Sequence, residues 1–147
     1  LIPDLWPLFP TDDPQGPSIE KFENLGSRSF SAEVAIGQAI EFQQLIGLHR
    51  KYDRLQYLKR YWVEQVQDLP RFRLHTSLNP EFGGAITNFS LEGFNYAQLS
   101  RKLILDYRIH TSPVKWDGVD GVRATPNVYT TLEELDRFVA ALQRVTP

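Results

Sequence analysis

GVRATPNVYTT, residues 121–131, is the stretch that decides the fold of this 147-residue chain, because a strand, a corner and a helix start follow one another within it. Side chains alternate along an extended backbone, so Val122 and Ala124 are expected to share one face of a strand. Arg123 and Thr125 then share the other face. The pattern predicts a guanidinium on the face of a strand, immediately ahead of the corner.

The corner and the helix after it are predicted from proline, threonine and glutamate. Pro126 has no N–H to donate to a sheet, so the strand is expected to end there. Thr131 and Glu134 have the spacing of a capping box, in which the hydroxyl accepts from an N–H of the first turn and the carboxylate accepts from the N-cap N–H. Thr130 and Glu133 offer the same pairing one residue earlier. A helix therefore begins here, and the corner is expected to hold the preceding arginine in a fixed direction.

The rest of the chain supplies further helices and strands. Amphipathic patterns predict three more helices, over 32–46, over 49–67 and from a capping box of Asn95 with Gln98 onward. Alternating apolar and polar residues predict three more strands, over 72–76, 84–91 and 108–114, before a loop over 115–120. This order predicts an α+β two-layer sandwich, with a small, mostly antiparallel sheet and helices packed on one face.

The N-terminal residues differ in composition from the remainder. Residues 1–20 contain five prolines and show no sustained periodicity, so no long regular element is expected there. Their apolar side chains are too many for a free linker and imply burial against another surface. The sequence thus divides into a connecting arm at 1–30 and a small C-terminal domain at 31–147.

Composition excludes several classes of function. Sixteen basic and eighteen acidic residues give a formal net charge of −2 without a basic run, so nucleic acid is not an expected partner. No apolar stretch approaches the roughly 20 residues that span a bilayer, and no signal-peptide pattern is present, so we expect a soluble, cytoplasmic protein with no membrane partner. The chain has no cysteine, and its three histidines are scattered, so no metal site is expected. His75 and His110 are interpreted as partly buried structural residues on strands.

Two features carry candidate binding chemistry, and each has a simpler structural interpretation. A guanidinium grips a carboxylate through two parallel hydrogen bonds, so Arg123 is a candidate carboxylate clamp, although most strand arginines only face solvent. Gly26 and Ser27 can hold a phosphate with backbone amides and a hydroxyl ahead of a helix, although such a pair is more often a turn or an N-cap. Arg28 can contact the same anion, or pair with a neighbouring glutamate.

Three runs resemble one known family in their order and spacing: KFENLGSRSF at 21–30, IEFQQLIGLHRKYDRL at 40–55 and GVRATPNVYTTLEELDRFVAAL at 121–142. They are similar to the C-terminal small domain of the class V aminotransferase family, pyridoxal-phosphate enzymes of fold type I, and most of all to its isopenicillin-N-epimerase-like branch. The resemblance implies that Arg123 holds the substrate α-carboxylate. It also implies that Gly26 and Ser27, where the family has a glycine–threonine pair, reach the cofactor phosphate of the neighbouring subunit in a homodimer.

The resemblance further implies that the chemical groups of the active site lie elsewhere. The Schiff-base lysine, the aspartate on the pyridinium nitrogen and the ring-stacking aromatic precede the matching region in such enzymes. These 147 residues alone are therefore expected to be inactive, to contain no catalytic residue, and to pack their arm against an absent large domain. The full-length enzyme would act on an amino or keto acid as an aminotransferase, epimerase or lyase, and the absence of cysteine disfavours a cysteine desulfurase reaction. The alternative is a self-contained α+β interaction or dimerisation module with no cofactor.

Overall fold

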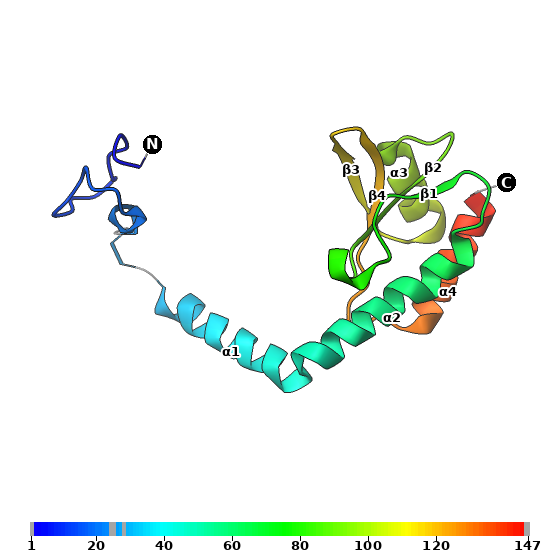
Figure 1. Ribbon diagram of the computed structural model, residues 1–147, viewed down its shortest axis with the longest axis horizontal. Coiled ribbons are helices and arrows are strands. Elements are labelled where there is room, and N and C mark those ends of the chain that lie inside the picture. Colours follow the sequence, from blue (N-terminus) through cyan, green and yellow to red (C-terminus); the bar gives the residue numbers. More distant parts are fainter. Residues whose placement is uncertain (1, 24–25, 28, 146–147) are drawn as a thin grey trace. The chain divides into compact units, whose positions relative to one another are not determined.

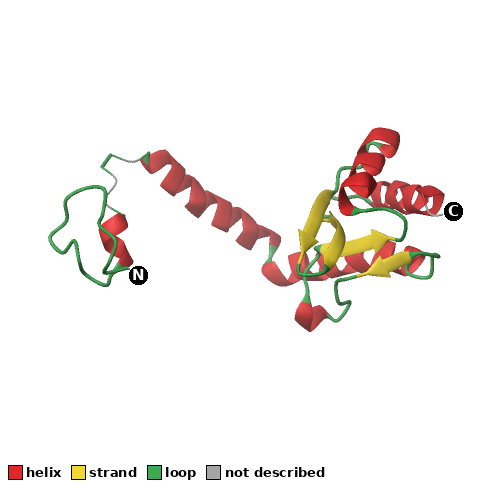
Figure 2. Cartoon of the chain, turned by 90° about the horizontal axis from the view of Figure 1, so that it is seen from above, coloured by secondary structure: helices red, strands yellow, loops and turns green. Residues whose placement is uncertain are grey.

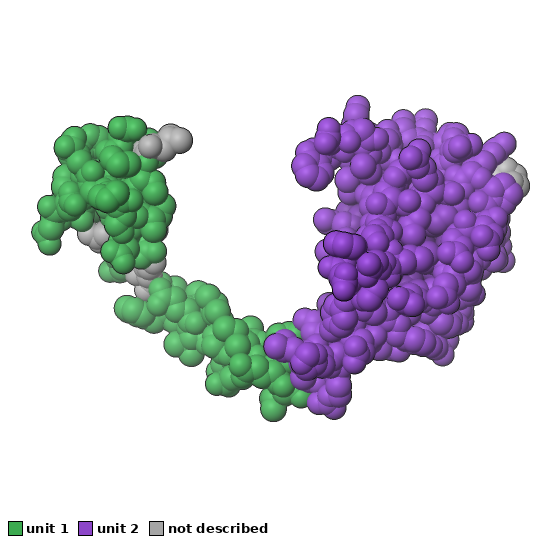
Figure 3. Space-filling view, viewed as in Figure 1, with its two compact units in different colours: residues 1–45 green, residues 46–147 purple. Residues whose placement is uncertain are grey.

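The computed structural model describes residues 2–23, 26–27 and 29–145. The chain forms two compact units, Leu1–Leu45 and Ile46–Pro147, which Figure 3 shows in different colours. The helix predicted over 32–46 lies almost entirely in the first unit. The functional division into an arm at 1–30 and a small domain at 31–147 stays a prediction.

The first unit contains a short 3-10 helix, η1 (Ile19–Phe22), and most of the α-helix α1 (Phe30–Ile46). Ser18 caps η1 by accepting a hydrogen bond from the N–H of Glu20 at 3.2 Å. The residue after α1, Gly47, has a φ of 86°, in the left-handed region that ends many helices. No side chain of α1 is buried among the described residues, and its large apolar side chains are exposed: Phe30, Val34, Ile36, Ile40, Phe42 and Leu45.

The second unit is an α+β sandwich. Its elements are α2 (Leu48–Val66), β1 (Phe72–Leu74), the 3-10 helix η2 (Pro80–Phe82), β2 (Thr87–Leu91), α3 (Tyr96–Tyr107), β3 (Ser112–Trp116), β4 (Val119–Ala124) and α4 (Leu132–Val145) (Figures 1 and 2). The four strands form one antiparallel sheet in the order β1-β2-β4-β3. Buried residues of α2, α3 and α4 join those of β2 and β4 in one cluster, so the helices cover one face of the sheet. The predicted fold class is confirmed.

Two predicted element boundaries were wrong in this region. The strand predicted over 108–114 begins only at Ser112, because Arg108 has a left-handed φ of 60° and ends α3. The loop predicted over 115–120 is instead a β3–β4 hairpin, in which Trp116 pairs with Val119. Asp117 and Gly118 both have positive φ, 44° and 79°, which suits the tight two-residue turns of hairpins. An Asp-Gly pair is a hairpin signal that the loop prediction overlooked.

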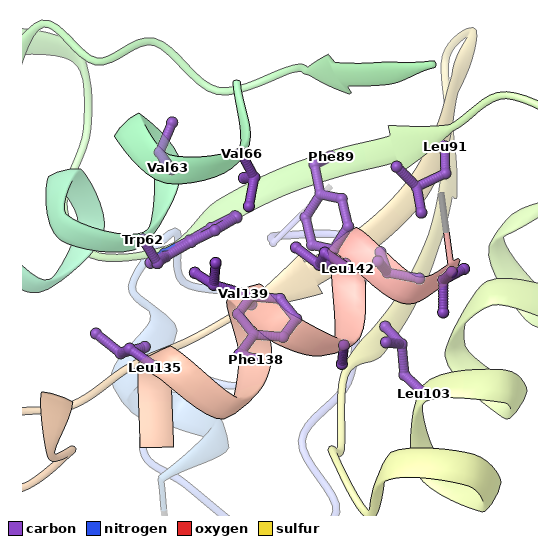
Figure 4. Packing of buried hydrophobic residues seen from close by; sticks show 14 of the residues in the cluster. Trp62, Val63, Val66, Phe89, Leu91, Leu103, Leu135, Phe138, Val139 and Leu142 are labelled. Atoms are coloured by element: carbon purple, nitrogen blue, oxygen red, sulfur yellow. The ribbon is translucent and has the colours of Figure 1, made fainter. Parts of the chain in front are cut away.

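Aromatic side chains form the centre of the core. The ring of Trp62 lies 5.0 Å from that of Phe138 and 5.6 Å from that of Phe89, with all three side chains buried (Figure 4). Phe72 stacks on Phe89 at 5.4 Å, which extends the cluster to β1. These contacts join α2, α4 and the sheet, so loss of any one ring is expected to leave a cavity that its neighbours cannot fill.

A buried lysine of helix α2 forms a hydrogen bond with a loop. Lys59 is 0% exposed, and its ammonium group donates a 2.7 Å hydrogen bond to the carbonyl oxygen of Ser77. Burial, and secondarily the charge of Arg60, lowers the pKa of Lys59. Tyr52 is exposed rather than part of the core, and its hydroxyl donates to the carbonyl of Pro80 at 2.6 Å. No local sequence signal indicates that this amine binds a loop carbonyl.

Among the described residues, no helix combines the length and the apolar character that crossing a membrane requires. Within the same residues, no three His, Cys, Asp or Glu side chains gather where they could hold a metal ion.

Candidate functional site

Arg123 lies on β4 as predicted, between two buried residues. Val122 and Ala124 are buried against the helices, whereas Arg123 and Thr125 are exposed. Because side chains alternate along a strand, the guanidinium projects from the face of the sheet opposite the core. We call this face the open face.

Hydrogen bonds within the corner, from α2 and at the start of α4 hold the corner after β4 in place. The N–H of Asn127 donates to the hydroxyl of Thr130 at 2.9 Å, and Arg54 of α2 donates to the carbonyl oxygen of Thr130 at 3.1 Å. The capping box of Thr131 and Glu134 is present with both of its bonds, at 3.2 and 2.9 Å, so that prediction is confirmed. The backbone beyond Arg123 is thus anchored to both α2 and α4.

Register places polar side chains beside Arg123. Asn88 of β2 and Ser112 of β3 lie directly opposite Arg123 on the two neighbouring strands. His75 follows β1, and its backbone N–H donates to the carbonyl oxygen of Asn88 at 2.9 Å. This bond places His75 next to Asn88 on the other side of β2 from Arg123. Paired residues of antiparallel strands point to the same face, so these polar side chains share the open face with Arg123. Sequence reasoning missed Asn88 and Ser112 because no local signal gives the register between distant strands.

The remaining open-face positions are uncharged, apart from a second arginine. Arg73 of β1 is exposed and lies opposite Ser90 of β2. The other members of the face on β3 and β4 are Val114, Trp116, Val119 and Gly121. Across the four described strands, the open face therefore carries two guanidinium groups and no carboxylate.

A cavity of about 210 Å³ lies behind the corner, on the helix side. Its lining includes Trp62, Ala124, Thr125, His110 and Phe138, but not Arg123. The indole nitrogen of Trp62 is buried there, and no described residue forms a hydrogen bond with it. His110 is exposed and precedes β3, so the prediction of a partly buried strand residue was wrong.

Gly26 and Ser27 lie in a bend of the first unit, ahead of α1. Gly26 has a φ of 76°, a conformation that favours glycine, and both residues are exposed. An exposed hydroxyl and a left-handed glycine just before a helix have the chemistry that a phosphate contact requires. Because Arg123 belongs to the second unit, the roles of Gly26, Ser27 and Arg123 in one site stay predictions. Arg28 lies outside the described residues.

Known proteins match the chain in sequence and in fold. Isopenicillin N epimerase of Streptomyces clavuligerus is 29% identical over 131 residues, which cover 88% of this chain and 33% of that enzyme. A cysteine desulfurase of Salmonella newport is 29% identical over 129 residues, covering 82% of this chain and 31% of that enzyme. The apo structure of a cysteine desulfurase from Thermococcus onnurineus superposes with a TM-score of 0.74 at 20% identity, over 86% of this chain and 33% of that one. No protein-family model matches the chain.

The fold is therefore that of the C-terminal part of pyridoxal-phosphate-dependent enzymes of fold type I. More narrowly, the chain is similar to the C-terminal part of class V aminotransferase-like enzymes, such as isopenicillin N epimerase and cysteine desulfurase, and the resemblance seen in the three sequence runs is confirmed. The chain spans about a third of the length of the curated relatives that it matches.

Proposed function

We propose that this chain is the C-terminal part of a pyridoxal-phosphate-dependent enzyme that acts, as a homodimer, on a small amino or keto acid. Arg123 binds the α-carboxylate of the substrate, and Gly26 and Ser27 contact the cofactor phosphate held by the neighbouring subunit. The lysine that carries the cofactor belongs to a large domain upstream of this sequence. The reaction is of the aminotransferase, epimerase or lyase type, and the absence of cysteine from these 147 residues disfavours a desulfurase reaction.

The observation that carries this proposal is the state of Arg123. Its side chain is exposed on the open face, and no carboxylate pairs with it among the described residues. A guanidinium without a protein partner keeps its planar fork of donors for an incoming carboxylate. The anchored corner behind it limits the directions that the strand end can take, which favours a defined binding geometry.

The residues at the start of α1 fit the cofactor's phosphate. When bound, pyridoxal phosphate withdraws electrons from the α-carbon of an amino acid. The part assigned to this chain is binding: the hydroxyl of Ser27 donates to a phosphate oxygen, and the left-handed glycine before it brings backbone close to the anion.

Cofactor affinity of the full-length enzyme tests the role of Ser27. A hydrogen bond to a charged group contributes about 1.5 to 3 kcal/mol, so Ser27→Ala is expected to raise the dissociation constant of pyridoxal phosphate at least about tenfold. Ser31→Ala is the matched control, because Ser31 is an exposed serine inside the first turn of α1. An unchanged dissociation constant for Ser27→Ala would count against the phosphate contact.

Substrate kinetics test the role of Arg123. Truncating one partner of a buried charge pair costs about 2 to 5 kcal/mol, so Arg123→Ala is expected to lower kcat/KM at least about 30-fold. The pair is buried only when substrate is bound, which is why the same arginine can be exposed in the chain alone.

A second candidate function is an interaction or dimerisation module without a cofactor. The apolar surface of the first unit favours it: Leu5, Trp6, Leu8 and Phe9 are exposed, as are the large apolar side chains of α1. Exposed apolar patches of this kind mark surfaces that another protein segment covers. In the enzyme that segment is the large domain, whereas in the module it is a separate partner. A gene that encodes an upstream cofactor domain, and a purified product with the absorbance of bound pyridoxal phosphate, would reject the module.

A further inference from the structure

The open face carries two exposed arginines whose directions are fixed by their strands. Arg73 stands between Phe72 and Leu74, which pack against the core, just as Arg123 stands between two buried residues. Alternation along each strand sends both guanidinium groups to the same side of the sheet. Only Arg123 has a place in the proposed function.

The register gives the separation of the two arginines. Arg73 lies opposite Ser90 and Arg123 lies opposite Asn88, so they are two strands apart and offset by two residues along β2. With about 4.8 Å between strands and about 3.3 Å per residue, their Cα atoms are about 12 Å apart. Two long side chains at this spacing can both reach a single small molecule lying between them.

The surface between the arginines carries only small or neutral side chains. The ring nitrogen Nε2 of His75 and the hydroxyl of Ser90 form a 2.8 Å hydrogen bond, and burial, then the charge of Arg73, lowers the pKa of His75. With a pKa below its ordinary value of 6.5, His75 is neutral at physiological pH. Gly121 has no side chain, and the carboxamide of Asn88 lies across it.

The charge of the face is unbalanced. Neither Arg73 nor Arg123 is within ion-pair distance of a carboxylate among the described residues. Two positive charges on one face attract an anion with two negative groups more strongly than an anion with one. A dicarboxylate has that property, and a monocarboxylate does not.

We infer that the open face selects amino or keto acids that carry a second carboxylate, with Arg123 binding the α-carboxylate and Arg73 the distal one. The inference rests on the proposed function for the assignment of Arg123. It adds a specificity residue, Arg73, and a substrate class, the dicarboxylic acids.

A binding experiment on the 147-residue chain tests the inference without enzyme activity. Glutarate and butyrate are titrated at pH 7 and constant ionic strength, and NMR follows the side-chain N–H signals of the arginines and the ring signals of His75. Glutarate is expected to bind more tightly by up to about fivefold, the upper range for one more exposed ion pair. Bound glutarate, but not butyrate, is expected to raise the pKa of His75, since the distal carboxylate offsets the charge of Arg73.

Three substitutions separate the inference from the proposed function. Arg73→Gln is expected to abolish the preference for glutarate and leave butyrate affinity unchanged, and Arg73→Lys to restore part of the preference. Arg101→Gln, at an exposed arginine of α3, removes the same charge away from the open face and is expected to change neither affinity.

Each contrary result contradicts a different claim. Equal affinity for the two acids in the unchanged chain, or a glutarate preference that survives Arg73→Gln, overturns the inference. Arg123→Gln is expected to weaken both acids. If it weakens neither, the assignment of Arg123 in the proposed function is wrong.

Discussion

The carboxamide of Asn88 on β2 lies directly over Gly121 on β4: a Cβ built on Gly121 would sit 2.7 Å from Asn88 Oδ1 and closer still to the carbonyl oxygen of Phe89. Real Cβ atoms do not approach other atoms this closely, and one of the two obstacles is backbone. Glycine at this position lets β2 and β4 pair while Asn88 remains beside Arg123.

Gly121→Ala is therefore expected to destabilise the second unit. Overpacking a tight site costs about 1 to 3 kcal/mol, and chemical denaturation would measure the change in the free energy of unfolding. Gly84→Ala is the matched control, because a Cβ at Gly84 meets nothing within 4 Å. Equal stability of the two variants would show that the strands can separate without cost.

The aromatic centre of the core gives a second prediction. Phe138 is buried against the rings of Trp62 and Phe89, so Phe138→Ala is expected to lower the free energy of unfolding by about 3 to 5 kcal/mol. Tyr129→Ala removes a ring of similar size that is 79% exposed, and surface changes of this kind usually stay within about 0.5 kcal/mol. A small loss for Phe138→Ala would mean that the core can collapse around the gap.

The helix cap at the corner gives a third prediction. Thr131→Ala removes the hydroxyl that accepts from the N–H of Glu134, and loss of such a cap costs about 1 kcal/mol. Thr131→Ser keeps the hydroxyl and is expected to retain most of the stability. Thermal unfolding of the three proteins checks this, and equal losses for both substitutions would assign the effect to the methyl group instead.

A pH-dependent contribution to stability is predicted at His75. Its pKa in the folded chain lies below the ordinary value of 6.5, chiefly through burial, so the unfolded chain binds more protons between these two pKa values. The contribution of His75 to the free energy of unfolding is thus fully present above pH 6.5. It falls as the pH drops from 6.5 through the lower pKa of the folded chain. His75→Gln is expected to flatten this dependence in chemical denaturation, whereas His110→Gln, at an exposed site, is expected to keep it. A steeper loss of unfolding free energy with falling pH in His75→Gln would contradict a lowered pKa of His75 in the folded chain.

The sequence predicts those parts of the fold whose causes are local. Alternation around Arg123 and the three-residue spacing from Thr131 to Glu134 predicted the end of β4, the corner and the start of α4, since each interaction involves close neighbours in the chain. The β3–β4 hairpin was also local, in its Asp117-Gly118 turn, but that signal was overlooked.

The candidate site is only partly visible in the sequence. The face of Arg123 could be predicted, but the opposition of Asn88 and Ser112 depends on the register between strands that are distant in sequence. The burial of Lys59 depends on a loop folding over α2. Such features arise from tertiary pairing, and no local pattern of residues determines them.

The most direct measurement of the central claim is kcat/KM for Arg123→Ala in the full-length enzyme, beside Arg101→Ala as an exposed arginine away from the open face. If Arg123 binds the substrate carboxylate, kcat/KM falls at least about 30-fold for Arg123→Ala and does not change for Arg101→Ala. A fall of about twofold or less for Arg123→Ala would contradict the claim that this arginine binds the substrate carboxylate.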